Sequence, residues 1–218
     1  LAQSYQVESV LNAEYPHIKT NIITIKTTGD KILEKNLNEI GGKGLFIKEL
    51  EEALVTNKID IAVHSAKDVP PQLRSGTTIA AYSKRKDPND YFISKKYQHI
   101  DDLPTGSVVG TSSARRKAVL LGYRPDLNIV NFRGNVDTRL QKIADGEVDA
   151  TVLALCGLER LEMKLENERI ITTDKMLPAV GQGSLALQTR SSDDYALQLV
   201  NPVNDQQSQI AVHCERQF

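Results

Sequence analysis

Short apolar runs alternate along the chain with longer stretches in which apolar residues recur at helical spacing. The short runs are rich in β-branched residues and are bounded by glycine, proline and other turn residues, a pattern typical of strands. Strands are predicted at residues 21–27, 61–63, 77–82, 107–110, 127–132, 150–155 and 184–189. Helices are predicted at residues 1–12, from Phe46 through Leu54, at 114–121 closed by Gly122, between Asn135 and Gly146, in the stretch that carries Arg160, and at 207–218.

The second half of the chain repeats one pattern, a strand followed by a polar turn and a helix. The strands at 107–110, 127–132 and 150–155 each lead into such a turn. Successive units of this kind form right-handed crossovers between parallel strands. The sequence therefore predicts an α/β fold with mainly parallel sheets. The polar stretches at 83–89 and 178–183 are predicted to connect two domains.

Composition narrows the class of protein. The chain has 218 residues, 40% of them hydrophobic, which is enough for one large core or two small ones. A net charge of −1 and 5% aromatic residues argue against a nucleic-acid surface, which needs a basic stripe and stacking rings. No run approaches the roughly 18 apolar residues of a membrane helix and no signal-peptide pattern occurs, so the cytoplasm is the expected compartment. Cys156 and Cys214 lack the spacing of metal ligands, and no metal site is expected.

A polar turn follows the apolar run at 61–63. The polar group at its end consists of His64, Ser65, Lys67 and Asp68, and Pro70 forbids continuation of the strand. Ligands of open α/β sheets bind at the carboxyl ends of strands, where the loops diverge. Asp68 beside Lys67 is suited to accept hydrogen bonds from N–H groups and to stabilise a developing cation. Taken alone, the stretch is explained better as a surface turn with a solvated ion pair.

Cations also gather where helices begin, although the helix dipole disfavours them there by a few tenths to about 1 kcal/mol. Such positions are occupied by Lys43, Arg115, Arg116, Arg133, Arg139 and Arg160, each after a predicted strand. These side chains are therefore predicted at one edge of the fold. Guanidinium groups pair with carboxylates or phosphates, and the lack of a phosphate-binding glycine motif favours carboxylates. Any one of them could be an ordinary solvated charge, but the whole set indicates a polyanionic ligand.

Five motifs occur in order over nearly the whole chain. They are Gly41-Gly42-Lys43-Gly44-Leu45-Phe46, Ala62-Val63-His64-Ser65-Ala66-Lys67-Asp68-Val69-Pro70, Gly110-Thr111-Ser112-Ser113-Ala114-Arg115-Arg116, Arg133-Gly134-Asn135-Val136 and Leu177-Pro178-Ala179-Val180-Gly181-Gln182-Gly183. Each is moderately specific by itself. Together they resemble the porphobilinogen deaminase family, also called hydroxymethylbilane synthase.

The resemblance implies an enzyme of haem and tetrapyrrole biosynthesis that condenses four porphobilinogen molecules head to tail into 1-hydroxymethylbilane and releases ammonia. It implies a covalently attached dipyrromethane cofactor that primes the growing chain. The protein is expected to be a monomer that binds neither nucleic acid nor membrane. The implied fold has two periplasmic-binding-protein type II-like domains with mainly parallel sheets, plus a small α/β third domain. On this chain the domains would be 1–83 with 184–199, 87–177, and 200–218 as the truncated start of the third.

By motif position, the resemblance makes Asp68 the catalytic carboxylate, which would contact pyrrole N–H groups and stabilise the azafulvenium cation formed as the amino group leaves. It implies cofactor or substrate binding for Lys43, Phe46, Ser65, Lys67, Thr111, Ser112, Ser113, Arg115, Arg116, Arg133, Gly134, Arg139, Gly157 and Arg160. Lys43 and Phe46 match the glycine-rich loop that covers the family's cleft.

Both ends of the chain depart from the family pattern. The cysteine that carries the cofactor is expected beyond Phe218, since neither Cys156 nor Cys214 occupies its motif position. The family's opening strand is expected before Leu1, which is not an initiator methionine. We therefore expect these residues to be the interior of a longer polypeptide.

Two other functions remain open on the sequence alone. A two-domain module of the same architecture can bind a small anion without catalysis. A nucleic-acid protein that uses its arginine pairs fits the charge and aromatic content poorly. An adduct of two pyrrole units on the full-length protein would distinguish the enzyme from the binding module.

Overall fold

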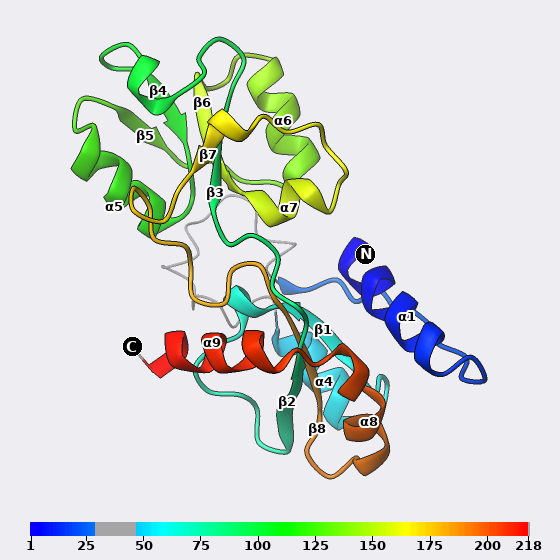
Figure 1. Cartoon of the computed structure of the whole chain (residues 1–218). Helices are drawn as coiled ribbons and strands as arrows, with labels where there is room; N and C mark the ends of the chain where they lie inside the picture. The colour runs from blue at the N-terminus through cyan, green and yellow to red at the C-terminus, as the bar shows by residue number, and fades with distance from the viewer. Residues whose placement is uncertain (29–46, 218) are drawn as a thin grey trace. The chain divides into compact units, whose positions relative to one another are not determined.

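The computed structural model describes residues 1–28 and 47–217 and contains two compact units (Figure 1). The first unit combines Leu1–Lys86 with Val180–Phe218, and the second comprises Asp87–Ala179. Residues 200–217, predicted from the resemblance to begin a third domain, cluster with the first unit. The chain therefore leaves the first unit once and returns to it once.

Each unit has its own helices and strands. The first unit contains α1 (Ala2–Glu14), α4 (Lys48–Val55), β1 (Ala62–Ser65), η2 (Ala66–Asp68), β2 (Thr77–Tyr82), β8 (Leu185–Arg190), α8 (Asp194–Leu199), η5 (Asn201–Val203) and α9 (Gln206–Gln217), where η marks a 3₁₀ helix. The second unit contains β3 (Asp90–Ser94), η3 (Ile100–Asp102), β4 (Val108–Gly110), α5 (Ala114–Tyr123), β5 (Asn128–Val130), α6 (Val136–Ala144), β6 (Ala150–Ala154), α7 (Leu155–Glu159), η4 (Asn167–Arg169) and β7 (Ile170–Ile171).

The described sheet of the first unit has the strand order β1-β8-β2. The central strand β8 runs antiparallel to both neighbours, with Leu187 opposite Val63 and Thr189 opposite Thr78. The return segment of the chain thus supplies the middle strand of a sheet begun by the first half. The prediction of parallel strands is wrong for this sheet, because a strand that arrives from a distant segment can enter in either direction.

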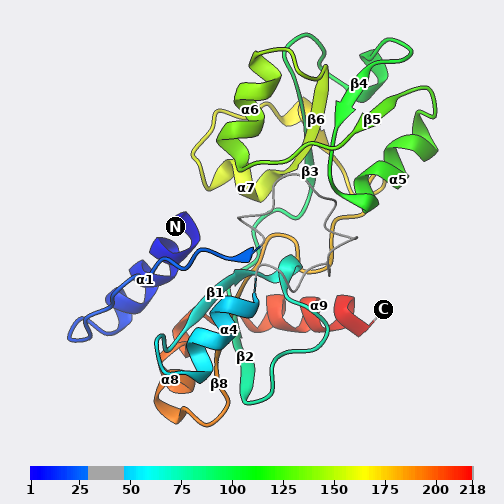
Figure 2. The same cartoon turned by 180° about the vertical axis from the view of Figure 1, so that it is seen from behind.

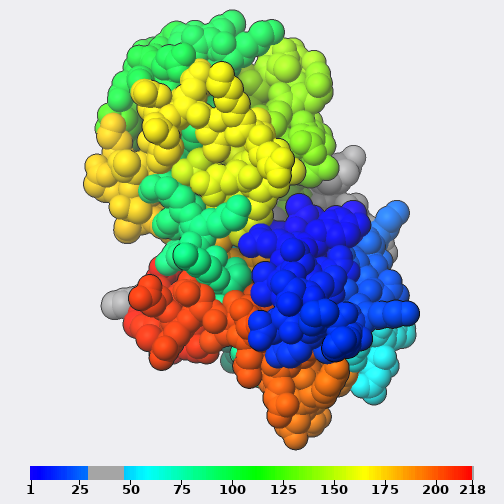
Figure 3. Space-filling model, turned by 45° about the vertical axis from the view of Figure 1, so that its right-hand side comes forward, coloured from blue at the N-terminus to red at the C-terminus, as the bar shows by residue number. Residues whose placement is uncertain are grey.

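Apolar side chains cover both faces of this sheet. Val7 and Leu11 of α1 pack with Leu187 on one face, and Val212 of α9 packs with Ala186 on the other. Neighbouring residues of β8 serve opposite faces because side chains alternate along a strand. Each fully buried valine or leucine stabilises the fold by roughly 1.5–3 kcal/mol. Figure 2 shows α4 beside β1, and Figure 3 shows α1 in blue beside the orange segment that contains η5.

The sheet of the second unit has the strand order β5-β4-β6-β3-β7. β4 is parallel to β5 and to β6, which confirms the predicted βαβ crossovers. β3 runs antiparallel to both β6 and β7, so the sheet is mixed. The strand at Asp90–Ser94 is not among the predicted ones, because the polar stretch directly before it is typical of a connection between domains.

Helices cover both faces of the second sheet. Leu120 of α5 packs with Phe92 and Val109 on one face, and Ile143 of α6 packs with Phe132 on the other. In Figure 1 these two helices lie on opposite sides of the strands. The carboxyl ends of β4 and β5 lead into turns at one edge, which is where the polar motifs occur. β6 instead passes directly into α7 at Leu155, so the turn predicted at Cys156-Gly157 is wrong.

Some predicted elements differ from the structure. Residues 21–27 form no strand, since no strand among the described residues gives them a hydrogen-bond ladder. Gly122 does not close its helix, because α5 ends at Tyr123 and its C-cap is Arg124. The glycines at 41–44 and Phe46 lie outside the described residues. The helix that follows them, α4, buries Ala53 and Leu54 as predicted.

Candidate functional site

The predicted carboxylate of the first unit lies where β1 ends. Lys67 and Asp68 belong to η2, a single 3₁₀ turn that begins directly after the strand. Both side chains are half-buried and both make interactions, so neither is a simply solvated charge. Ser65, the last residue of β1, accepts a 2.8 Å hydrogen bond from Gln3 Nε2 of α1. The sequence prediction of a polar turn at the carboxyl end of a buried strand is confirmed.

Hydrogen bonds fix the backbone of this turn on two sides. Ala66 N donates to Ser184 O at 3.0 Å, just before β8 begins. The Arg216 guanidinium of α9 donates to Val69 O at 3.0 Å and to Pro70 O at 2.6 Å. Because Pro70 cannot continue the ladder, these carbonyl groups need a donor from elsewhere, and one planar guanidinium supplies both bonds. α9 thus holds the segment that carries Asp68.

A buried polar chain links β1 to the rest of the first unit. His64 is 5% exposed, and its Nε2 lies 2.9 Å from Gln188 Oε1 of β8. Gln188 Nε2 donates to Glu51 Oε1 at 2.9 Å and to Thr77 Oγ1 at 2.7 Å, so the amide oxygen faces His64 and the imidazole Nε2 is the donor. Burial lowers the pKa of His64 to about 4, against smaller raising effects of the Gln188 hydrogen bond and the Glu51 charge. His64 is therefore neutral at pH 7 and its role is structural.

Glu215 anchors the two segments that connect the units. Its carboxylate accepts two hydrogen bonds from the Arg85 guanidinium, one from Nη1 and one from Nη2, the latter at 3.1 Å from Oε2. It also accepts a hydrogen bond from Gly181 N at 2.8 Å. Gly181 has φ +71, and a Cβ there would lie 3.0 Å from Ala66 Cβ, so the return segment packs closely on the turn. Both connecting segments are thus fastened to α9 within the first unit.

In the second unit, the hydroxyl groups between β4 and α5 stabilise local structure. Ser113 Oγ accepts from Arg116 N at 3.3 Å and caps α5. Ser112 Oγ donates to Phe132 O at 3.0 Å and accepts from Phe132 N at 3.1 Å, which ties this turn to the segment after β5. Thr111 is buried and its Oγ1 accepts from Ser113 N at 3.2 Å. Ligand contacts by these three residues stay a prediction.

The arginine pair at the start of α5 shares one buried carboxylate. Asp90 of β3 is fully buried; its Oδ1 lies 2.7 Å from Arg116 Nη2 and its Oδ2 lies 2.7 Å from Arg115 Nη2. Arg116 is 7% exposed, and its buried Nε, like that of Arg115, has no hydrogen-bond partner among the described residues. Arg115 Nη1 also donates to Leu177 O. Two guanidinium groups on one carboxylate leave a positive charge in a largely buried place, which is costly without a further anion.

Two more of the predicted cations lie near the start of the next helix, Arg133 in the segment before α6 and Arg139 in α6 itself. Arg139 of α6 is half-buried, and burial, followed by the Arg116 cation, lowers the pKa of its guanidinium to about 10. It stays protonated at neutral pH. Arg133 is half-buried and makes interactions of its own. The structure thus brings Arg115, Arg116 and Arg139 together in one positive region of the second unit.

The predicted glycines differ in their surroundings. Gly134 has φ +123, and a Cβ there would lie 2.9 Å from Thr138 Cγ2, so the backbone before α6 requires glycine. Asn135 then caps α6 by accepting from Thr138 N at 2.8 Å. Gly157 lies within α7, where an added Cβ would meet open space. Arg160 directly follows α7 as its C-cap, so the prediction that it lies where a helix begins is wrong.

Three residues that hold these groups in place were not predicted from the sequence. Asp90 had a usable signal, an acidic residue at the head of the apolar run at 91–93. Gln188 and Arg216 had none, since their partners are far away in sequence. Lys43 and Phe46 lie outside the described residues and stay predictions.

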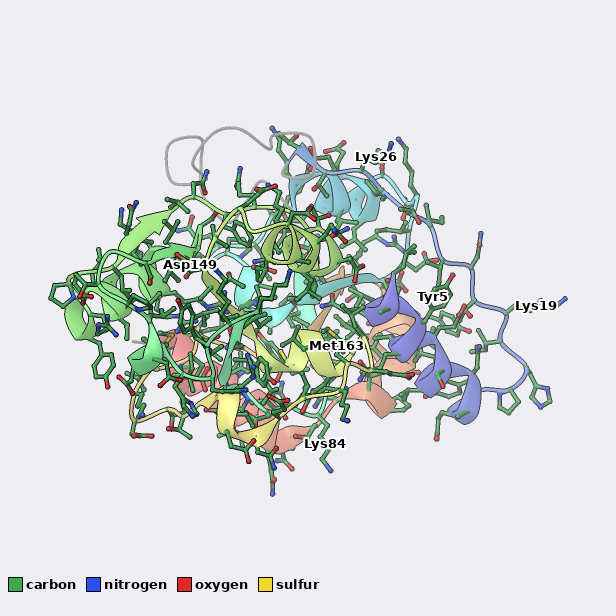
Figure 4. All side chains as sticks on the ribbon, turned by 90° about the horizontal axis from the view of Figure 1, so that it is seen from above. Tyr5, Lys19, Lys26, Lys84, Asp149 and Met163 are labelled. Atoms are coloured by element: carbon green, nitrogen blue, oxygen red, sulfur yellow. The ribbon has the colours of Figure 1, made fainter. Side chains whose placement is uncertain are left out.

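Other charged groups of the molecule differ from this cluster. Lys19, Lys26 and Lys84, labelled in Figure 4, are exposed, and Lys19 extends away from the ribbon. Among residues 1–28 and 47–217, no group of three or more histidine, cysteine or acidic side chains is arranged to hold a metal ion. In the same ranges no helix is both long and apolar enough to cross a bilayer.

The fold is similar to that of periplasmic binding proteins. A periplasmic substrate-binding protein of an ABC transporter from Coxiella burnetii aligns with 98% of this chain and 93% of its own, at a TM-score of 0.58 and 14% identity. A methionine-binding protein aligns with 99% of this chain and 91% of its own, also at 0.58 and 14%. At these identities the likeness concerns the fold, which places the chain among α/β proteins with periplasmic-binding-protein type II architecture.

Sequence comparison identifies the family. The model described as "Porphobilinogen deaminase, dipyromethane cofactor binding domain" matches residues 1–198. All of the chain aligns at 46% identity with the chloroplastic porphobilinogen deaminase of Oryza sativa subsp. japonica, covering 62% of it, and at 46% with that of Nitrobacter hamburgensis, covering 70%. The Francisella tularensis subsp. tularensis enzyme is 49% identical over 98% of this chain and 69% of its own. The chain belongs to the porphobilinogen deaminase family and spans 62% to 70% of the length of these relatives.

Proposed function

We propose that the full-length protein is a hydroxymethylbilane synthase, a transferase that joins four porphobilinogen molecules head to tail into 1-hydroxymethylbilane and releases ammonia. The observation that supports this most directly is the positive region at Arg115, Arg116 and Arg139 in a chain of this family. Porphobilinogen carries two carboxylates per ring, so the growing chain accumulates negative charge. Arginine forks are suited to pair with those carboxylates.

Asp68 is the proposed catalytic carboxylate. Positive charge develops on the substrate as ammonia leaves, and a fixed carboxylate beside the pyrrole nitrogen stabilises that transition state more than the ground state. The turn that carries Asp68 is tied to β8 and to α9, so the carboxylate needs little reorganisation during the reaction. Lys67, next in sequence, favours the ionised form of such a group.

The described residues fit a carboxylate-bearing prosthetic group such as dipyrromethane. The buried guanidinium of Arg116 and the half-buried one of Arg139 would donate hydrogen bonds to the acidic substituents of the pyrrole rings and would hold the group in place. When bound, the group supplies the primer to which substrate rings are added. We propose further contacts to cofactor or substrate from Lys43, Phe46, Ser65, Lys67, Thr111, Ser112, Ser113, Arg115, Arg133, Gly134, Gly157 and Arg160.

The proposal extends to the setting of the protein. We propose a cytoplasmic monomer that binds neither nucleic acid nor membrane, although the rice relative is described as chloroplastic. The domain limits 1–83 with 184–199, 87–177, and 200–218 as the start of a third domain, are proposed from the family, as is an attachment cysteine beyond Phe218.

The test is made on the full-length protein. Intact mass should show an adduct of two pyrrole units, and the protein should convert porphobilinogen into 1-hydroxymethylbilane with release of ammonia. A protein that binds porphobilinogen, carries no adduct and produces no ammonia would be an anion-binding module, and the proposal would be wrong.

A further inference from the structure

Asp90 occupies a rigid place in the second unit. It is the first residue of β3, with Ala154 of β6 opposite it on one side and Ile171 of β7 on the other. Its side chain is fully buried. A buried carboxylate destabilises the fold unless charged partners compensate it, so a physical reason is needed for its presence at this position.

The contacts of Asp90 give that reason. Each carboxylate oxygen receives one Nη2 group at 2.7 Å, Oδ1 from Arg116 and Oδ2 from Arg115. A guanidinium is planar and carries its donors in a fixed fork, so one short bond and a buried stem restrict the plane of the whole group. One carboxylate thereby orients two neighbouring side chains that would otherwise repel each other.

The arginine pair is not neutralised by this contact. Asp90 provides one negative charge for two guanidinium groups, and the positive charge of Arg116 is felt as far as Arg139, whose pKa it helps to lower. Buried Nε atoms of both arginines have no hydrogen-bond partner among the described residues. A pair held in place but left positive is the arrangement expected of a preorganised anion site.

We propose that Asp90 is a positioning residue: it holds the guanidinium groups of Arg115 and Arg116 in the orientation in which they receive ligand carboxylates. The inference rests on the proposed function, because the ligand carboxylates are those of porphobilinogen and its products. Asp90 itself does not contact the ligand. Its effect is exerted through the two arginines.

The two possible roles of Asp90, charge compensation and positioning of the arginines, predict opposite changes in affinity for porphobilinogen when Asp90 is replaced. If Asp90 only compensates charge, Asp90→Asn makes the site more positive and porphobilinogen binds more tightly. If Asp90 positions the arginines, the same variant binds more weakly although the site has gained positive charge. Asp90→Glu keeps the charge and displaces the carboxylate by one methylene, so any change in affinity with this variant reports position alone.

The experiment uses full-length protein produced in cells that cannot make porphobilinogen, so that no pyrrole adduct is present. The dissociation constant is measured by calorimetry with a porphobilinogen analogue that carries a methyl group in place of the aminomethyl group, so that no ammonia can leave and the ligand does not react. The arginine side chains are observed by ¹H–¹⁵N NMR. Asp126→Asn is the matched control, because Asp126 pairs with Arg124 at 2.7 Å in the same unit but lies outside the arginine cluster. Circular dichroism verifies folding of each variant.

We expect slowly rotating guanidinium signals for Arg115 and Arg116 in the wild-type protein and in Asp126→Asn. Both signals should broaden or disappear in Asp90→Asn, with binding of the analogue weaker by about tenfold or more. Asp90→Glu should fold and bind several-fold more weakly at unchanged net charge. If Asp90→Asn does not fold, the Asp90→Glu comparison decides the question.

Equal or tighter binding by Asp90→Glu, or tighter binding by a folded Asp90→Asn, would overturn the proposal. Unchanged arginine signals in Asp90→Asn would overturn it as well. A wild-type protein that does not bind the analogue would instead count against the proposed function. In that case the arginine signals still decide whether Asp90 holds the pair.

Discussion

The two units hold their candidate site residues by different physical means. In the first, the turn with Asp68 is fixed by hydrogen bonds to its backbone, and the preceding strand β1 is tied to β8 by a buried histidine that is neutral at pH 7. In the second, Arg115 and Arg116 are fixed by a buried ion pair to Asp90. The comparison teaches that the turn with the proposed catalytic carboxylate is held through its backbone, whereas the two neighbouring arginine side chains are held by a shared counter-charge.

The largest expected effect is on turnover, and it tests the role of the first unit. Asp68→Asn keeps the size of the side chain and removes its charge, so the cation formed as ammonia leaves loses its stabilisation. We expect turnover by the full-length protein to fall about a hundredfold or more, as when one preorganised electrostatic contact is lost. Ammonia release would be measured after mass spectrometry has verified the pyrrole adduct.

Asp68→Ala should be slower still. Turnover near the wild-type rate by the adduct-bearing asparagine variant would show that another group stabilises the cation.

The second effect is a pH dependence of stability in the first unit. The pKa of His64 is about 4 in the folded chain, below its ordinary value of 6.5, because burial disfavours the charged imidazole. Above pH 6.5 His64 is neutral in both the folded and the unfolded chain, so it does not make the free energy of unfolding depend on pH. Between pH 6.5 and 4 only the unfolded chain takes up this proton, so the free energy of unfolding falls by about 1.4 kcal/mol per pH unit, roughly 3 kcal/mol in all.

Urea unfolding from pH 7 to 4 would measure this slope. His64→Gln keeps a hydrogen-bonding partner for Gln188 and cannot titrate, so its curve should be flatter by that amount. Parallel curves for the two proteins would mean that other groups govern acid unfolding.

A third, smaller effect should follow from releasing the turn from α9. Arg216→Gln removes the donors to Val69 O and Pro70 O, and the free energy of unfolding should fall by about 2 kcal/mol, the usual range for hydrogen bonds from a charged group. Turnover should fall as well, since Asp68 lies in the released turn. Thermal unfolding and ammonia release would be measured together.

Cys214→Ser is the matched control on the same helix, because Cys214 is exposed. It should leave both quantities unchanged. An Arg216→Gln protein as stable as the wild type would mean that the turn does not depend on α9.

The smallest expected effect on stability concerns the second unit. Arg133→Leu removes a half-buried cation that contributes little to the core, so the free energy of unfolding should change by less than about 1 kcal/mol. Adduct formation or elongation of the pyrrole chain should nevertheless weaken, because one donor for carboxylates is lost. Intact mass over time would follow both.

Unfolding of this variant would make Arg133 structural, contrary to its proposed role. Normal adduct formation and turnover would remove it from the set of carboxylate-binding residues.

Much of the fold followed from local pattern. The strand at 77–82 was predicted to the residue, and the parallel strands β4, β5 and β6 were recognised because each is a short apolar run followed by a helix. Strand direction in the first unit was not predictable in this way, since β8 comes from the return segment. Residues 21–27 have the composition of a strand, but composition supplies no partner for a hydrogen-bond ladder.

The site was predictable only in part. The positions of Asp68, Arg115 and Arg116 at strand ends follow from sequence spacing, because a strand end and a helix start are local features. The role of Asp90 as the shared partner does not follow: its place at the head of an apolar run is visible in the sequence, but it reaches the arginines only through the pairing of β3 with β6. Neither does the role of Arg216, whose guanidinium meets Val69 and Pro70 only after α9 has packed on the sheet.

The anchoring of both connecting segments to Glu215 has a consequence for how such a chain can be assembled. Lys86 N donates to Gly183 O at 3.3 Å, so the chain leaves and re-enters the first unit at neighbouring points. Neighbouring entry and exit points are the condition under which one domain can be inserted into another without disturbing the host. Residues 87–179 therefore have the topology of an insertion into the first unit.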